Sequence, residues 1–437
     1  MRKRNSALFG RSGRAVSAGL ALLALIGCSR VGMSSDKPSG ANNNGAAASE
    51  AMKEENKSTG GNVDPRLSAA STKFGLKLYS EIGKQSAGKN VFISPASVAL
   101  ALAMTYNGAG GETGQAMARG LELSGMSLEE ANRAYAELHK SLQSLDPKVQ
   151  IEIANSLWGR KEMKFRPDFL DRAKEFYGAE VTSLDFNDPG APAAINDWVS
   201  RKTHGKIGKI VDQIGQDSIL FLINAIYFKG KWTDEFEKAE TTDQDFTLAG
   251  GKVKKHPMMS RTGRYPYFKG ENFQAVSIPY GNKRVSMYVF LPEKGASLDE
   301  FVKGMDGAAW DGWMSRFRET KGDIVLPRFK LEYEITLNDA LASLGMGVAF
   351  DPDRADFSGM LQEGRRAFIS SVKHKSFVEV NEEGTEAAAA TSVEVQTTSA
   401  RIERDTFRMV VDHPFFFAIR DNQTGMILFM GSINDPS

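Results

Sequence analysis

The residues that follow Gly384 alternate with a period of two, and this pattern restricts the fold of its segment more than any other feature of the chain. The odd-numbered positions carry uncharged residues that are small or β-branched: Thr385, Ala387, Ala389, Thr391, Val393, Val395 and Thr397. The even-numbered positions carry every charge and amide of the window: Glu386, Ala388, Ala390, Ser392, Glu394, Gln396 and Thr398. A period of two is typical of a β-strand with one buried and one solvated face.

This segment is also compatible with other structures. As a strand it would be about 43 Å long at ~3.3 Å per residue, which exceeds the usual length of three to ten residues. The composition equally suits a solvated loop rich in alanine, and residues 386–390 could form a helix. No proline blocks a backbone donor between Gly384 and Ala400. We therefore hypothesise a segment that is stored outside a sheet and can enter it with its odd face buried and its even face in solvent.

The whole chain has a globular composition, with 41% hydrophobic and 25% charged residues among 437. Lys and Arg number 55 and Asp and Glu number 54, so the formal net charge of +1 argues against nucleic acid as a partner. Residues 64–437 contain no second low-complexity linker and no internal repeat. We expect them to form one compact domain.

Hydrophobic periodicity predicts both helices and strands in this domain. Apolar residues recur at helical spacing over residues 67–82 and again over residues 95–106, where Ser94-Pro95 is a helix start signal. Short apolar or aromatic runs at residues 219–223, 285–291 and 415–419 are typical of buried strands. Helices followed by many strands predict an α+β fold.

The N-terminus has the pattern of an export signal. Basic residues without an acid precede an apolar stretch of about a dozen residues, which is shorter than the ~20 that a membrane-spanning helix needs. The stretch ends in Leu25-Ile26-Gly27-Cys28, which resembles the lipobox of bacterial lipoproteins. The alternative is an ordinary signal peptide with an incidental cysteine, but the chain uses cysteine nowhere else.

This pattern predicts the domain organisation and the location. Residues 1–27 would be a lipoprotein signal peptide, Cys28 the lipidated residue, residues 28–63 a disordered tether rich in Ser, Gly and Asn, and residues 64–437 the folded domain. We expect an exported protein that is anchored to the bacterial cell envelope by its lipid alone, with the outer membrane as one alternative. The domain would face the periplasm or the exterior.

A search for catalytic chemistry finds no complete motif. G-x-S-x-G and H-E-x-x-H are both absent, and residues 108–111 lack the third glycine of a nucleotide-binding loop. No two of the five histidines are spaced i, i+4, and one cysteine can form neither an intramolecular disulfide nor a cysteine metal site. We expect no enzyme, no metal and no cofactor.

The segments around the alternating pattern resemble the serpins. Glu382-Glu383-Gly384-Thr385-Glu386-Ala387-Ala388-Ala389-Ala390-Thr391 is similar to the proximal hinge of that family. Residues 411–417 and 425–431 resemble its C-terminal signature. Residues 90–97, 154–158 and 222–232 resemble its early helix start, a strand start and its central-sheet block. These matches follow the order of the family along the whole domain.

The resemblance implies a fold of about nine helices and three β-sheets with an exposed reactive-centre loop. It also implies a suicide-substrate inhibitor of a serine-type protease, with a cysteine-type protease as an alternative target. Cleavage of the loop would give an acyl-enzyme, and insertion of the loop into the central sheet would then trap the protease. The alternative within the family is a non-inhibitory member that acts as a binding or chaperone-like module. We expect a monomer whose partner is a protease.

The resemblance also places the functional residues. The scissile bond would lie at Thr398–Ser399, which suits an elastase-like or subtilisin-like protease, with Arg401–Ile402 as second choice for a trypsin-like one; a papain-like target is a further alternative. The shutter beneath the sheet would comprise Ser94, Ser97, Asn224 and His374. The breach, where insertion begins, would include Trp232 and Glu382, although plain core packing explains Trp232 equally well.

Overall fold

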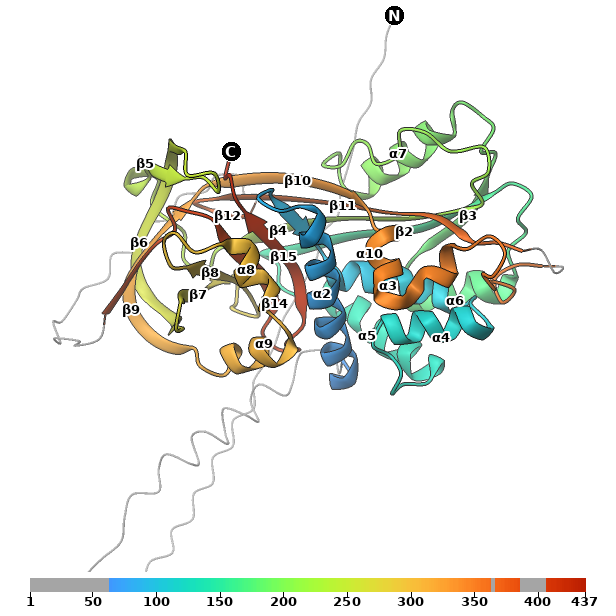
Figure 1. Cartoon of the computed structure of the whole chain (residues 1–437), viewed down its shortest axis with the longest axis horizontal. Helices are drawn as coiled ribbons and strands as arrows, with labels where there is room; N and C mark the ends of the chain where they lie inside the picture. Colours follow the sequence, from blue (N-terminus) through green and yellow to red (C-terminus); the bar gives the residue numbers. More distant parts are fainter. Residues whose placement is uncertain (1–62, 363–365, 386–405) are drawn as a thin grey trace, which may run out of the picture. The chain divides into compact units, whose positions relative to one another are not determined.

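The computed structural model describes residues 63–362, 366–385 and 406–437. Contacts divide the chain into residues 1–58 and residues 59–437, and every described residue belongs to the second unit. Figure 1 shows its helices packed against two β-sheets. No helix within the described ranges is long and apolar enough to cross a membrane. No group of three or more metal-ligating side chains is found among the same residues.

Nine α-helices lie within the described residues, together with short 3-10 and π turns. The α-helices are α2 (Pro65–Gln85), α3 (Pro95–Tyr106), α4 (Gly111–Gly120), α5 (Leu128–Gln143), α6 (Pro167–Tyr177), α7 (Ala191–Lys202), α8 (Leu298–Lys303), α9 (Gly307–Met314) and α10 (Asn338–Leu341). Several begin where the sequence provides a cap. Asp64 caps α2 by accepting from the backbone N–H of Arg66, and Ser127 and Glu130 form a capping box on α5.

The described strands form two hydrogen-bonded sheets. The six-stranded sheet has the order β10-β11-β12-β4-β2-β3. Its strands are β10 (Phe329–Thr336), β11 (Ile369–Asn381), β12 (Gly384–Thr385), β4 (Leu220–Lys231), β2 (Val149–Arg160) and β3 (Glu180–Leu184). The predicted strand start at residues 154–158 therefore lies in the middle of β2, because the alternating residues before it also join the sheet.

The second sheet has nine strands, and the long strand β6 pairs with β5, β7 and β9 along its length, so that two groups of strands share one network. The strands are β1 (Val91–Ile93), β15 (Ile427–Ile433), β14 (Phe415–Asp421), β8 (Val285–Pro292), β7 (Phe273–Tyr280), β6 (Val253–Lys269), β9 (Arg318–Pro327), β13 (Thr406–Val410) and β5 (Thr242–Thr247). One group precedes β6 in the strand order, and β9, β13 and β5 form the other. This continuity explains why two networks are found where three sheets were expected.

Two hydrophobic cores cover the two faces of β4. Leu220, Leu222, Ile226 and Phe228 point into the main core with α2 and α3. The alternate residues Phe221, Ile223, Ala225 and Tyr227 pack with Ile195, Trp198 and Val199 of α7. Helix α3 lies centrally and is apolar on every side, as expected of a helix without a solvent face.

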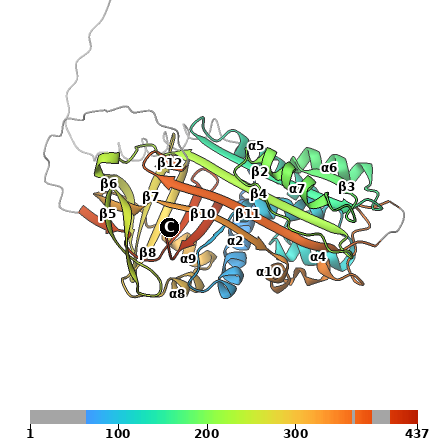
Figure 2. The ribbon, with the colours of Figure 1, turned by 90° about the horizontal axis from the view of Figure 1, so that it is seen from above.

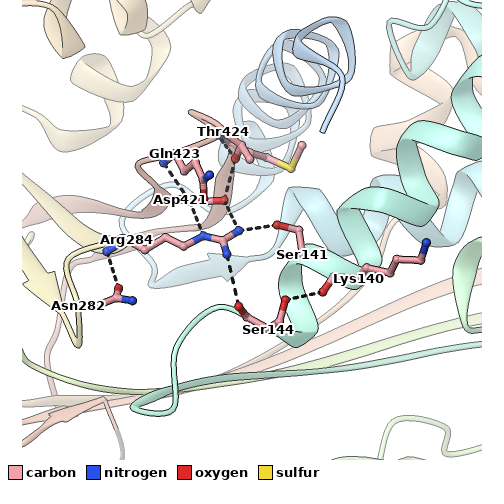
Figure 3. Close-up of polar contacts among 9 residues, drawn as sticks. Lys140, Ser141, Ser144, Asn282, Arg284, Asp421, Gln423 and Thr424 are labelled. Carbon is pink, nitrogen blue, oxygen red and sulfur yellow. Dashed lines mark hydrogen bonds and ion pairs between the residues drawn. The ribbon is translucent and has the colours of Figure 1, made fainter. Parts of the chain in front are cut away.

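An arginine in the β7–β8 turn joins the end of α5 to the nine-stranded sheet. The Arg284 guanidinium donates to the Asp421 carboxylate over 3.2 and 3.3 Å and also to the Ser141 hydroxyl and the Ser144 carbonyl (Figure 3). The Asp421 side chain is 2% exposed and that of Arg284 is 11% exposed. This buried ion pair fixes α5 immediately before β2 begins.

Candidate functional site

The candidate site is the line along which β11 and β4 pair in parallel. Their register runs from Val372 opposite Leu222 to Phe377 opposite Tyr227. At one end of this line the two strands diverge and β12 lies between them (Figure 2). Thr385 pairs with Val380 of β11 on one side and with Gly230 of β4 on the other. The first odd-numbered residue of the alternating segment is thus already part of the sheet.

The turn before β12 is held by backbone hydrogen bonds from residues 232–236. The backbone N–H of Trp232 donates to the carbonyl of Glu383 over 3.0 Å, and that of Phe236 donates to the carbonyl of Glu382 over 2.8 Å. The Trp232 indole N–H donates to the Asn381 carbonyl over 2.9 Å. Trp232 was predicted for the breach, and it contacts the hinge directly in addition to packing in the core.

Two carboxylate side chains of this turn, those of Glu382 and Glu383, are buried. Glu382 is 2% exposed and accepts from the Arg328 Nε over 2.7 Å and from the Thr241 hydroxyl. Burial acts to raise the pKa of Glu382, but the hydrogen bonds from Arg328 and Thr241 outweigh it and hold the pKa below its ordinary value. Glu383 accepts from the Lys238 ammonium over 2.6 Å. Both pairs fix the hinge turn at the top of the sheet.

Thr385 is fully buried and its hydroxyl meets the hydroxyl of Tyr280 at 2.8 Å. The Tyr280 ring stacks on Trp232 with centroids 4.3 Å apart. The preceding Gly384 has φ of +144°, and a Cβ there would come within 2.1 Å of the Gly230 carbonyl oxygen. Only glycine fits this position, because β12 approaches the β4 backbone so closely.

The four residues predicted for the shutter lie together beneath the paired strands. The His374 Nδ1 is 2.5 Å from the Asn224 side-chain oxygen, which also accepts from the Ser97 hydroxyl over 2.9 Å. The Ser94 backbone N–H lies 3.2 Å from the His374 Nε2. Nε2 therefore accepts and Nδ1 donates, which makes His374 neutral in one tautomer. This cluster connects β11, β4 and the start of α3.

Burial lowers the pKa of His374 from 6.5 to about 3. Because the folded pKa lies below that of the unfolded chain, the stability that neutral His374 contributes is present above pH 6.5 and is lost as the pH falls toward 3. We expect a loss of about 1.4 kcal/mol per pH unit within this window. Urea unfolding at several pH values measures it, and His374→Asn removes the titrating group. An equal pH slope in the variant would contradict this assignment.

The other face of the six-stranded sheet is largely covered by protein. Over the length of β4 that pairs with β11, the residues on that face are covered by α7 and by residues 207–211. Lys229 is half-buried beyond this cover. On this face, β4 is therefore accessible to solvent near its hinge end, whereas α7 and residues 207–211 cover the part that pairs with β11.

Several predicted residues lie outside the described ranges. They are Cys28, the hinge residues Glu386, Ala387, Ala388, Ala389, Ala390 and Thr391, and the reactive-bond residues Thr398, Ser399, Arg401 and Ile402. Sequence reasoning also missed residues that the structure places at the hinge: Thr241, Lys238, Tyr280 and Arg328. No local signal marks them, because they come from three separate places in the chain: the turn at residues 238–241, the end of β7 and the connection between β9 and β10.

Comparison with models of protein families matches residues 69–436 to the family described as "Serpin (serine protease inhibitor)". The chain belongs to the serpin family. The family description and the name of a relative, the leukocyte elastase inhibitor, refer to inhibitors of proteases and not to enzymes. The α+β expectation and the serpin fold are confirmed.

Relatives match this serpin over nearly their whole length. Human serpin B8 is 37% identical over 378 residues, which is 85% of this chain and 99% of the relative. The human leukocyte elastase inhibitor is 36% identical over 386 residues, which is 85% of this chain and 100% of the relative. The native crystal structure of tengpin, a thermophilic serpin, has a TM-score of 0.79 and 34% identity and covers 86% of this chain and 96% of tengpin.

Proposed function

We propose that this serpin is a suicide-substrate inhibitor whose loop enters the gap between β11 and β4 after cleavage. The observation that carries the proposal is β12, which already lies between the two strands with Thr385 buried. Insertion then does not have to begin a new strand, because the residues after Thr385 would extend β12, which is already paired with β11 and β4. The name of the human leukocyte elastase inhibitor supports a protease as the partner.

The register of β12 specifies the path of the inserted residues. If the pairing of Thr385 with Gly230 and Val380 continues along the inserted loop, Ala387 would lie between Phe228 and Val378, and Thr391 would lie between Asn224 and His374. These β4 and β11 residues are all buried on the side of the main core. Every odd-numbered residue from Thr385 to Thr397 would therefore face the core, and none of these is charged. Thr391 would arrive at the shutter, where its hydroxyl can hydrogen bond.

The energy of insertion comes mainly from backbone pairing. Ten inserted residues would add on the order of ten ladder hydrogen bonds at ~1 kcal/mol net each. With an unfolding entropy of about 2.1 cal/mol/K per residue, this corresponds to a rise of at least about 10 °C in the melting temperature of a domain of this size. The intact loop cannot gain this energy while both of its ends remain attached.

Incubation of the full-length chain with elastase, subtilisin, trypsin and papain tests the proposal on a denaturing gel. An inhibitor gives a complex that survives boiling in detergent, and the same protease with a blocked active site gives none. Loop cleavage without a complex, together with an unchanged melting temperature after nicking, would instead support the non-inhibitory binding or chaperone-like alternative. We propose Thr398–Ser399 as the cleaved bond, so the released C-terminal peptide should begin at Ser399; a peptide that begins at Ile402 would establish Arg401–Ile402.

We also propose that Cys28 is lipidated and that the chain is exported to the cell envelope. The support is the basic start, the short apolar stretch and the lipobox-like Leu25-Ile26-Gly27-Cys28. Mass spectrometry of the N-terminal peptide from membranes tests this, with Cys28→Ser as the control. Release of the wild-type protein into the soluble fraction, without added lipid mass, would contradict it.

A further inference from the structure

The end of the β11–β4 pair opposite to the hinge contains an interruption. Ile369 pairs with Leu220 and Ser371 pairs with Phe221, so Ser370 is an extra residue on β11. Such a bulge leaves one residue outside the ladder and loosens backbone pairing locally. At Ser370 the backbone of β11 therefore does not continue the regular pairing with β4.

The Ser370 side chain closes the gap instead. Its hydroxyl accepts from the backbone N–H of Ile219, immediately before β4, over 2.8 Å. The Ile219 carbonyl in turn accepts from the backbone N–H of Arg160 at the end of β2 over 3.0 Å. One hydroxyl thus joins β11 to the β4–β2 half of the sheet across the line along which the sheet must open.

The Ser370 backbone is fixed from the other side by α10. The Asn338 side chain donates to the Ser370 carbonyl over 3.0 Å and accepts from the Val372 N–H over 2.9 Å. These bonds lie on the β10 side of β11 and do not cross the gap. They hold the bulge rigidly, so that the hydroxyl can reach Ile219.

We propose that the Ser370 hydroxyl is a clasp that must open in the last stage of loop insertion and so sets how fast that stage is completed. The inference rests on the proposed function, because in the inserted state the register of β12, continued along the loop, would bring Val395 between Leu220 and Ser370. A strand that extends to this residue displaces the Ser370–Ile219 bond. If the Ser370–Ile219 bond opens slowly, the acyl-enzyme has time to hydrolyse. Hydrolysis releases active protease and leaves a cleaved inhibitor.

Four full-length proteins test the clasp: wild type, Ser370→Ala, Ser370→Thr and Ser343→Ala. Ser370→Thr retains a hydroxyl, and Ser343 makes one local bond to the Asp339 carbonyl in an exposed position. We expect Ser370→Ala to form the detergent-stable complex up to about fivefold faster, which is the effect of one hydrogen bond, and to need fewer inhibitor molecules per protease. Ser370→Thr and Ser343→Ala should behave as wild type.

Melting temperatures of intact and nicked protein separate the clasp from a general packing role. Ser370→Ala should lower the melting temperature of the intact form alone, because insertion breaks the bond in the nicked form. Equal losses in both forms, or an unchanged rate of complex formation, would overturn the clasp. If wild type forms no complex with any protease, the proposed function fails, and the clasp is then decided by the two melting temperatures alone.

Discussion

Replacing Ala387 with arginine is expected to turn this serpin from an inhibitor into a substrate. In the proposed inserted state, the register of β12 would continue so that residue 387 lies between Phe228 and Val378, which are both fully buried. Ala387→Arg would bring an unpaired guanidinium into this apolar position at a cost of several kcal/mol. Because insertion competes with hydrolysis of the acyl-enzyme, we expect at least about a 100-fold loss of stable complex.

The neighbouring position supplies a matched control for this change. Residue 386 would lie between Lys229 and Glu379, which are both partly exposed. Glu386→Arg adds the same side chain to the same loop but directs it toward solvent, so stable complex should form nearly as in wild type. The loop must still be cut in both variants, as the released C-terminal peptide shows. Equal loss of complex in the two variants would refute the proposed register.

Arg284→Met is expected to destabilise the domain by about 3 kcal/mol, because it leaves the Asp421 carboxylate buried without its counter-ion. This loss lies at the lower end of the range usual for removing one partner of a buried ion pair. The reason is that the Gln423 N–H and the Thr424 hydroxyl still donate to Asp421 (Figure 3). The end of α5 also loses the hydrogen bonds that Arg284 donates to the Ser141 hydroxyl and the Ser144 carbonyl. The midpoint of urea unfolding measures the loss.

The double variant Arg284→Met with Asp421→Leu separates a broken ion pair from lost packing. Removing both charges removes the unpaired carboxylate, so much of the lost stability should return. Lys294→Met is the control, since Lys294 is exposed and pairs with Asp412 at 3.2 Å on the surface. A double variant no more stable than Arg284→Met would show that Arg284 acts through packing and through α5 instead.

Much of the fold was predictable because local signals coincide with the elements. The helix expected over residues 95–106 is α3 with the same bounds, and the apolar runs at 219–223, 285–291 and 415–419 lie at β4, β8 and β14. The strand start at residue 154 was misplaced, because Val149 to Ile153 are polar in part and join the sheet only through β4. Sheet partners decide strand ends that local propensity leaves open.

The sequence alone determined which residues can enter a sheet. The odd-numbered positions from Thr385 to Thr397 carry neither charge nor proline, which is a property of the order of residues and needs no coordinates. The shutter residues followed from motif resemblance, and they lie together beneath β11 and β4.

Only the tertiary structure decided where that segment can go. Tyr280, Arg328 and Ser370 come from separate strands or turns, and no pattern in the chain relates them to the hinge or to the gap. Their roles depend on distances across a sheet between residues far apart in sequence. Pairing over such separations arises when the whole core assembles, which is why local sequence carries no record of it.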